Sequence, residues 1–369
     1  MRPPLYRTRI TELLGIRHPI LAGGLGPKVS DGRYVASIVN AGGMGFIVAA
    51  GFPDATEFRE QLQRCRELTG GQPFGVNLYI SRQAGGVDRV KRQIDILVEE
   101  GVSCVETAGA SPEAIVPLLK QAGVKVLHKV PAVRYALSAA KLGVDAVIVV
   151  GNDCGGHPGL YGIGSIVQAA HAAQVIDLPI VIGGGIGTGR QIAAVLAMGA
   201  DAVLMGTRLL VTEELWVHRA AKDLVVNGDG TESVVVKKAI RDHHRVYRNA
   251  SAEAALVLDD AKTTDFEPYR PHVMGALAHQ AWVSGDMRTG MIDYGPAAVF
   301  ADAGSLWGTT RNAAALPGVV GGTPALRASA GVGLTWDSPL GPLRADYAFP
   351  LVKQAYDKTQ PFSFGLQPF

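Results

Sequence analysis

Eight short apolar runs, separated by stretches with helical periodicity, constrain the fold of this chain more than any other feature. The intervening stretches, such as "SPEAIVPLLKQAG", end in glycine, as helices often do. A parallel strand that is covered on both faces is apolar throughout, so each run predicts such a strand. The predicted strands are residues 19–24, 45–50, 74–80, 103–109, 124–130, 145–151, 179–185 and 201–207.

This alternation predicts an α/β fold, a (β/α)8 TIM barrel over residues 1–211. The main alternative is a doubly wound dinucleotide-binding fold. That fold needs G-x-G-x-x-G after its first strand and an acidic residue about 20 positions later. Neither "GGLGPK" nor "GGGIGTG" meets this requirement, and no G-x-x-x-x-G-K-[ST] occurs. We therefore expect the barrel.

Two further segments follow the barrel. Residues 212–300 have a helical pattern, with "ELWVHRAAKDLVV", "SVVVKKAIRDHHRVYRNAS" and "HVMGALAHQAWVSGD". This pattern predicts a small helical domain that is attached to the last strand of the barrel and completes the same protein. Residues 301–369 are rich in glycine and proline and alternate with a period of two, which predicts a C-terminal antiparallel β appendage.

Composition excludes several classes of function. The net charge of +2 and the absence of a basic cluster beside aromatic residues argue against nucleic-acid binding. The start of the chain lacks the apolar core of a signal peptide, and no uncharged apolar run reaches the about 18 residues of a membrane helix, so we expect a cytoplasmic protein. Cys65, Cys104 and Cys154 are far apart, and no H-x-H or H-E-x-x-H occurs, so neither a disulfide framework nor a metal site is predicted.

The ends of the predicted strands carry glycines, amides and few charges. Chemistry in such a barrel occurs at the C-terminal strand ends, and the loops after strands seven and eight commonly hold a phosphate. The alternative is that these glycines only form tight turns. The other strand ends form a flat, apolar, amide-lined bed suited to a planar tricyclic ring. The predicted cofactor-binding residues are Gly23, Gly24, Leu25, Asn77, Lys129, Gly155, Gly156, Gly183, Gly184, Gly185, Gly206 and Thr207.

One histidine lies in a strand-end glycine loop, in the stretch "GNDCGGHPG". An imidazole titrates near neutral pH, so His157 is the titratable side chain expected beside a ligand bound at this loop. Lys129, at the end of strand five, could place a cation near a ring or its phosphate. The remaining candidates fall in helical stretches, where surface or core positions are expected: His171, His218, His243, His244, His272 and His279.

The motifs resemble those of the nitronate monooxygenase family over residues 7–300. The matching stretches, in order, are "HPILAGGL", "NAGGMG", "PFGVNL", "VETAG", "KVLHKV", "GVDAVIVVGNDCGGHPG", "PIVIGGGIGTGRQ" and "GADAVLMGTRLL". The resemblance implies a flavoprotein in which His157 faces the substrate and in which the following residues contact FMN: Gly23, Gly24, Asn77, Lys129, Gly155, Gly156, Gly184, Gly185, Gly206 and Thr207. It also implies oxidation of alkyl nitronates with O2, with His157 as the base. Asp153 and Gly155 stand where relatives often have Glu and Ala.

The same scaffold hosts other reactions, and three alternatives stay open. "KVLHKVPAVRYALSAAKLGVDA" and "DCGGHPG" are similar to an NADH:quinone reductase branch. Reduction of an enoyl thioester is a second possibility. A non-catalytic flavin-binding protein is the third, although the position of His157 argues against it.

The C-terminal tail resembles a different family. "LRASAGVGLTW" and "SPLGPLRADYAFPL" alternate as strands do, and together with "DKTQPF" and "PFSFGLQPF" they resemble the closing strands of the outer-membrane β-barrel assembly protein. "VFADAGSLWG" is similar to one strand earlier. We infer a fusion near residues 298–304, with an ordinary β appendage of the enzyme as the alternative. Membrane barrels need at least about eight strands, so about four predict no functional membrane insertion.

Overall fold

The computed structural model describes residues 7–26, 28–81, 85–296, 328–338, 341–352 and 362–366. The chain divides into two compact units, residues 1–300 and 301–369. No helix among these described residues is both long and apolar enough to span a membrane.

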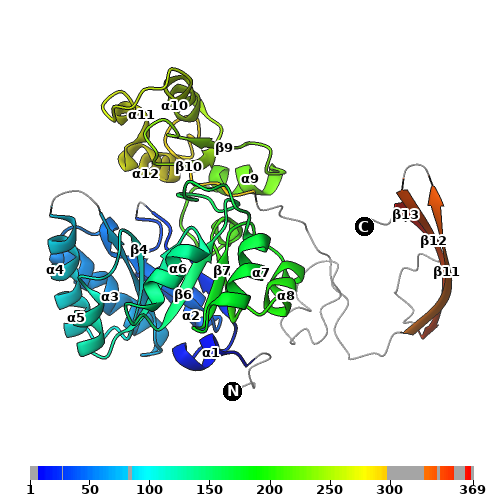
Figure 1. Cartoon of the computed structure of the whole chain (residues 1–369), viewed down its shortest axis with the longest axis horizontal. Coiled ribbons are helices and arrows are strands. Elements are labelled where there is room, and N and C mark those ends of the chain that lie inside the picture. The colour runs from blue at the N-terminus through cyan, green and yellow to red at the C-terminus, as the bar shows by residue number, and fades with distance from the viewer. Residues whose placement is uncertain are drawn as a thin grey trace. The chain divides into compact units, whose positions relative to one another are not determined.

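The first unit is built on a closed barrel of eight parallel strands that pair in chain order, with β1 closing onto β8 (Figure 1). Each predicted strand is present, and the predicted (β/α)8 barrel is confirmed. The strands are β1 (Ile20–Ala22), β2 (Met44–Val48), β3 (Gly75–Ile80), β4 (Cys104–Gly109), β5 (Lys125–Val130), β6 (Ala146–Val150), β7 (Ile180–Gly183) and β8 (Ala202–Met205).

Helices follow the first seven strands, and the 3-10 helix η2 (Thr207–Val211) follows β8. In the long helix α3, Asp54 accepts hydrogen bonds at the N-terminus and Gly70 ends the helix in the left-handed conformation. The barrel helices are α2 (Gly32–Asn40), α3 (Ala55–Thr69), α4 (Gly86–Glu99), α5 (Val116–Gln121), α6 (Val133–Ala140), α7 (Ser165–Val175) and α8 (Gly189–Ala197), and α1 (Arg9–Leu14) precedes β1.

Both faces of the strands are buried, which explains the continuous apolar runs. On β6, Ala146, Ile148 and Val150 belong to the core inside the barrel. Val147 and Val149 belong to the layer between the strands and the helices. Every residue of this strand therefore leaves water, and none needs to be polar.

Residues 212–296, which we call the cap lobe, follow the barrel (Figure 1). Part of the predicted helical pattern is wrong here. "SVVV" and "HRVY" form an antiparallel pair of strands, β9 (Ser233–Val236) and β10 (His244–Tyr247), because three consecutive β-branched valines favour a strand. The helices of the lobe are α9 (Arg219–Asn227), α10 (Ala250–Asp260), α11 (Arg270–Val273) and α12 (Gly275–Ser284).

The second unit contains an antiparallel sheet in the order β11 (Ala328–Ser338), β12 (Gly341–Val352) and β13 (Phe362–Leu366). Its register pairs Val332 with Tyr347 and Ala345 with Phe364. The strands predicted at "LRASAGVGLTW", "SPLGPLRADYAFPL" and "PFSFGLQPF" are thus confirmed. The strand predicted at "VFADAGSLWG" and the predicted junction at residues 298–304 lie outside the described residues.

We expect a chain that ends at Phe300 to fold as the first unit of the full chain does. The core clusters that surround the barrel and fill the cap lobe are formed by residues before that position. Circular dichroism of the truncated and full chains should give the same thermal midpoint, and the truncated chain should be the more soluble. Loss of cooperative unfolding on truncation would instead make the tail a part of the first unit.

Candidate functional site

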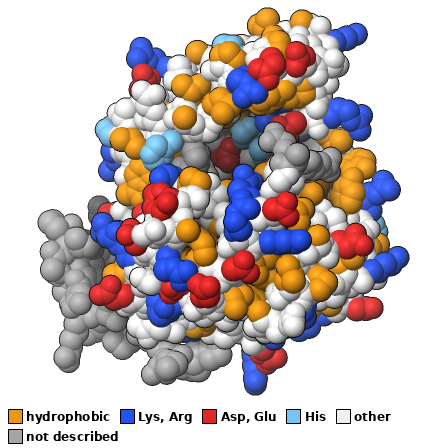
Figure 2. Space-filling view, turned by 90° about the vertical axis from the view of Figure 1, so that its left-hand side faces the viewer, with side chains coloured by type: hydrophobic (Ala, Val, Ile, Leu, Met, Phe, Trp, Pro, Cys, Tyr) orange, Lys and Arg blue, Asp and Glu red, His pale blue; other side chains and the backbone are white. Residues whose placement is uncertain are grey.

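A cavity of about 1040 Å³ opens at the C-terminal ends of the barrel strands. Figure 2 shows histidine and acidic side chains in a hollow below the cap lobe. Every predicted site residue except Gly183 lines the cavity. Gly183 ends β7, and a Cβ added there would lie 3.0 Å from Cβ of Leu204 and 3.1 Å from Cγ1 of Val150, so this position faces other strands of the barrel.

The glycines after β7 allow a close approach of the backbone. Gly184 has φ +103°, and a Cβ there would come within 2.6 Å of the Ser165 hydroxyl. At the start of α8, Oε1 of Gln191 accepts hydrogen bonds from the N–H groups of Gly187 (2.9 Å) and Thr188 (3.0 Å). Both residues precede the first turn of α8, which Thr188 caps through a hydrogen bond that its Oγ1 accepts from the N–H of Gln191. The phosphate cradle at the ends of β7 and β8 stays a prediction.

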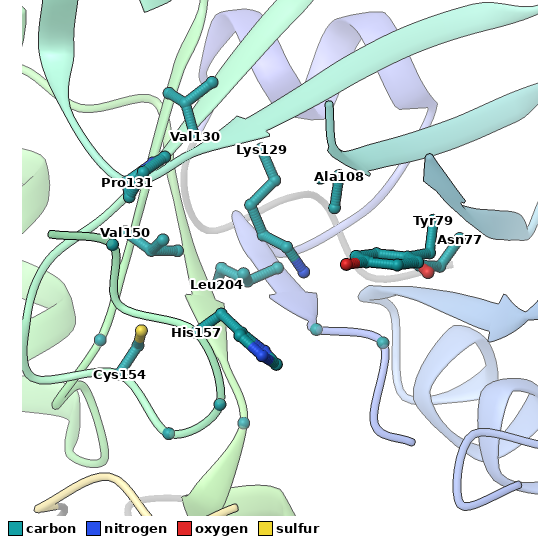
Figure 3. Close-up of a pocket in the computed structure, with 18 of the residues that line it drawn as sticks. Asn77, Tyr79, Ala108, Lys129, Val130, Pro131, Val150, Cys154, His157 and Leu204 are labelled. Carbon is teal, nitrogen blue, oxygen red and sulfur yellow. The ribbon is translucent and has the colours of Figure 1, made fainter. Parts of the chain in front are cut away.

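The backbone after β1 also comes close to side chains of the neighbouring strands β2 and β3. A Cβ on Gly24 would lie 2.9 Å from Cγ2 of Val48 and 3.0 Å from Cβ of Asn77. Asn77 and Tyr79 extend into the cavity from the same strand (Figure 3). These residues form one side of the cavity, opposite His157.

The loop that carries His157 is fixed by β10 of the cap lobe. The N–H of Gly156 donates to the carbonyl of Arg245 (3.0 Å), and the N–H of Arg245 donates back (2.6 Å). Nε of Arg245 also donates to the carbonyl of Asn152 (2.8 Å). Burial raises the pKa of Cys154 to about 12, so this thiol stays protonated and is no nucleophile at neutral pH.

His157 lies in a cluster with side chains that the sequence analysis did not assign to the site. Its Nε2 lies 3.4 Å from Oδ1 of Asp242, and Lys237 donates to Oδ2 of the same carboxylate (2.6 Å). The His157 ring stacks on that of His244, with centroids 4.4 Å apart and planes 18° apart. Nε2 of His244 is hydrogen-bonded to Oδ1 of Asp293 (2.7 Å). Two carboxylates therefore accompany two imidazoles.

The charges in this cluster follow from burial and pairing. Burial opposes ionisation of Asp242, but the hydrogen bond and charge of His157, together with Lys237, outweigh it and lower the pKa of the carboxyl. Burial, and then the charge of His157, lowers the pKa of His244, although Asp293 acts in the opposite direction. At neutral pH, Asp242 is an anion and His244 a neutral ring. The prediction that His244 lies in a helix is wrong, because it begins β10, but it is buried, which agrees with a core position.

Lys129 reaches into the cavity, where Figure 3 shows its amine between His157 and Tyr79. The amine also contacts Oε1 of Glu106, a side chain that is wholly buried inside the barrel. The cation that the sequence predicts near a ligand is therefore balanced by an anion on the neighbouring strand β4. No group of three or more His, Cys, Asp and Glu that could hold a metal occurs among the described residues.

A buried histidine beside the cavity predicts a dependence of stability on pH. His128 is buried and hydrogen-bonded to Thr107 (2.8 Å), and burial lowers its pKa to about 4. A folded-state pKa below the unfolded value means that stability is full above about pH 6.5 and is lost as the pH falls towards 4. In His128→Gln, the free energy of unfolding should fall by up to about 3 kcal/mol less between about pH 6.5 and about pH 4 than in the unmodified protein. Urea titrations at these two pH values measure the difference. The exposed His171→Gln serves as control, and equal pH dependence in both variants would contradict the assignment.

Two family models match different parts of the chain, as the two resemblances in the sequence predict. A family model described as nitronate monooxygenase matches residues 7–306, and one described as Omp85 superfamily domain matches residues 279–367. The predicted resemblance of both parts is confirmed. The predicted junction at residues 298–304 falls where the two matches overlap.

Individual relatives differ in their named activities. A Rhodococcus jostii protein named (3aS,4S,5R,7aS)-5-hydroxy-7a-methyl-1-oxo-octahydro-1H-indene-4-carboxyl-CoA dehydrogenase is 37% identical over 65% of this chain and 65% of its own length. A probable nitronate monooxygenase of Staphylococcus aureus is 27% identical over 63% of this chain and 75% of its own. The structure of FabK from Thermotoga maritima superposes with a TM-score of 0.70 at 29% identity, covering 79% of this chain and 89% of FabK.

Proposed function

The chain belongs to the nitronate monooxygenase family, whose enzymes are flavoproteins, and on that premise we propose that it is an FMN-dependent oxidoreductase with His157 as its base. One observation carries the proposal. His157 faces a large cavity beside the carboxylate of Asp242, and the glycine-rich ends of β7 and β8 line the same cavity. A proton acceptor and a potential phosphate cradle thus share one space.

The residues of the cavity fit FMN. Gly184, Gly185, Gly206 and Thr207 would hold its phosphate, because bare backbone at two strand ends admits an anion where side chains would exclude it. Asn77 and the glycines after β1 would lie against its ring. FMN, when bound, would supply the acceptor for the electron pair that leaves the substrate carbon.

The side chains of this site are arranged to take up a proton. His157 would accept it from the carbon next to the nitro group of a neutral nitroalkane, which gives the nitronate, or from the carbon next to the thioester carbonyl of an acyl-CoA. The imidazolium so formed would face the anionic Asp242. Lys237, buried beneath, holds that carboxylate in position. The stacked ring of His244 covers one face of His157 and leaves the cavity side for substrate.

An alkyl nitronate, with O2 as second substrate, is the first candidate, because the family match and the Staphylococcus aureus relative carry that activity in their names. A CoA thioester is the second candidate, and a specific observation favours it. The relative at 37% identity is named for a carboxyl-CoA substrate. A carbon next to a thioester carbonyl, like a carbon next to a nitro group, bears an acidic hydrogen that suits a histidine base.

The purified protein should be yellow and should release FMN on denaturation, because we propose one phosphate position, at the ends of β7 and β8, and the sequence has no dinucleotide-binding turn. Chromatography of the released cofactor checks this expectation. FAD, or no flavin after incubation with FMN, would remove the cofactor assignment.

Anaerobic stopped-flow mixing then tests the reaction. The flavin-loaded protein is mixed separately with an alkyl nitronate, an acyl-CoA and NADH, and the flavin absorbance is followed. Bleaching by the nitronate or the acyl-CoA selects the substrate class. Dependence on His157 is expected for the acyl-CoA and for the parent nitroalkane of the nitronate, because these two carry the proton that the base removes. Rapid bleaching by NADH alone, with reoxidation by a quinone, would instead favour the NADH:quinone reductase. No bleaching by any of the three would leave a flavin-binding protein without this chemistry.

A further inference from the structure

Two tyrosines contribute to the lining of the cavity. Tyr135 belongs to α6 and Tyr161 to the loop between β6 and α7, and both line the cavity. They are nevertheless 40% and 47% exposed. Large aromatic side chains that remain in contact with water beside a cavity provide apolar surface for a ligand. With Arg134 and Arg241 they form what we call the mouth cluster.

The members of the mouth cluster hold one another in place. The hydroxyls of Tyr135 and Tyr161 are 3.1 Å apart, and their ring centroids are 6.2 Å apart. The guanidinium carbon of Arg134 lies 5.8 Å from the centroid of each ring, within the range of a cation–π interaction. The rings are therefore ordered before any ligand arrives, which lowers the entropic cost of binding.

The cluster is also cationic. Arg241 reaches the cavity from the turn between β9 and β10, where its φ of +56° is unusual for a residue with a side chain. The hydrogen bond with Tyr135, and then the charges of Arg134 and Arg241, lower the pKa of the Tyr161 hydroxyl. Three separate segments thus contribute to the mouth cluster: Tyr135, Tyr161 and Arg241 line the cavity, and Arg134 lies beside both rings. The proton transfer proposed for His157 uses none of them.

We infer that the mouth cluster binds the adenine nucleotide portion of a substrate or cosubstrate, with the base on a tyrosine ring and phosphates at Arg134 and Arg241. Stacking suits any purine, and guanidinium groups pair with phosphate through two hydrogen bonds. This inference rests on the proposed function and extends its CoA-thioester candidate. CoA and NADH both carry an adenine nucleotide, whereas a small nitronate or a quinone does not.

Isothermal titration calorimetry of the flavin-loaded protein tests the inference, with the flavin reduced beforehand under anaerobic conditions so that NADH binds without transferring hydride. The ligands are CoA, NADH, adenosine 3′,5′-bisphosphate and pantetheine, which lacks the nucleotide. We expect at least one of the two cofactors to bind about tenfold or more tightly than pantetheine, since each charged hydrogen bond contributes roughly one such factor. Binding of adenosine 3′,5′-bisphosphate would identify CoA as the ligand whose nucleotide the mouth cluster binds. Binding of NADH alone would identify the dinucleotide.

Variants locate the binding. Arg134→Ala combined with Arg241→Ala should weaken the nucleotide ligand about tenfold or more. Tyr161→Leu should also weaken it, while Tyr161→Phe, which keeps the ring, should restore most of the affinity. Arg64→Ala on α3, an exposed arginine that does not line the cavity, is the matched control.

Two outcomes would overturn the inference: CoA and NADH bind no better than pantetheine, or the mouth-cluster variants bind as the unmodified protein does. Failure of the proposed function would appear differently, as absence of FMN or of flavin bleaching. The two results can therefore be told apart.

Discussion

His157→Asn should keep FMN and lose turnover by about 10²–10⁴-fold, the range typical for removal of a general base. The asparagine side chain is polar and similar in size but cannot accept a proton at neutral pH. The backbone bonds between Gly156 and Arg245 do not involve the side chain, so the loop should keep its place. Steady-state rates on whichever substrate bleaches the flavin, together with the flavin content, provide the measurement.

The matched control is His171→Asn on α7, whose side chain is exposed and does not line the cavity. Near-normal turnover of a neutral nitroalkane or an acyl-CoA by His157→Asn would remove His157 from the mechanism. A preformed nitronate has already lost its carbon-bound proton, so its turnover should be affected much less. Unchanged reduction of a quinone by NADH would point to the alternative reaction, because hydride delivery by NADH needs no base at a carbon–hydrogen bond.

Lys129→Met should lower the free energy of unfolding by about 3–5 kcal/mol, the usual cost of removing one partner of a buried ion pair. The reason lies with Glu106, whose side chain is inaccessible to solvent and whose Oε1 contacts the lysine amine. Without the amine, the carboxyl must either stay charged inside the barrel or take up a proton. Denaturation by urea at pH 7 measures the loss.

A second variant separates this effect from a general loss of packing. Lys129→Met combined with Glu106→Leu removes both charges and should recover most of the lost stability, because an apolar pair often replaces a buried ion pair without cost. Equal destabilisation by the single and the double variants would show that the lysine acts through its aliphatic stem. Flavin content, measured in parallel, reports whether Lys129 also matters to the cofactor.

The barrel was predictable because its strands are apolar on both faces and each is followed by a helix with recognisable ends. The strand pair in the cap lobe was not. The turn between β9 and β10 contains no glycine, and its left-handed positions are occupied by Lys237 and Arg241. Without Asn-Gly or Asp-Gly between the valines and "HRVY", the usual sequence signal of a hairpin is missing, and the charged residues suggested a helix.

The barrel half of the site was also predictable, since parallel strands bring their C-terminal ends together whatever their spacing in sequence. The partners of His157 were not, because they come from a different part of the chain. Asp242 and His244 lie on the hairpin that was missed, and Asp293 follows the last helix of the cap lobe. The alternation in "HRVY" was the available signal for β10, and it would have placed His244 and Val246 on one buried face.

The stacked histidines differ in their access to water, and this difference determines where the hydrogen taken from a substrate would go. The side chain of His157 is half exposed, at 52%, whereas that of His244 is buried and disfavours a second positive charge. A proton held by His157 would therefore pass to the surrounding water and would not be stored in the protein. Deuterium placed on the reacting carbon would wash out into the solvent, and any return step would incorporate solvent hydrogen.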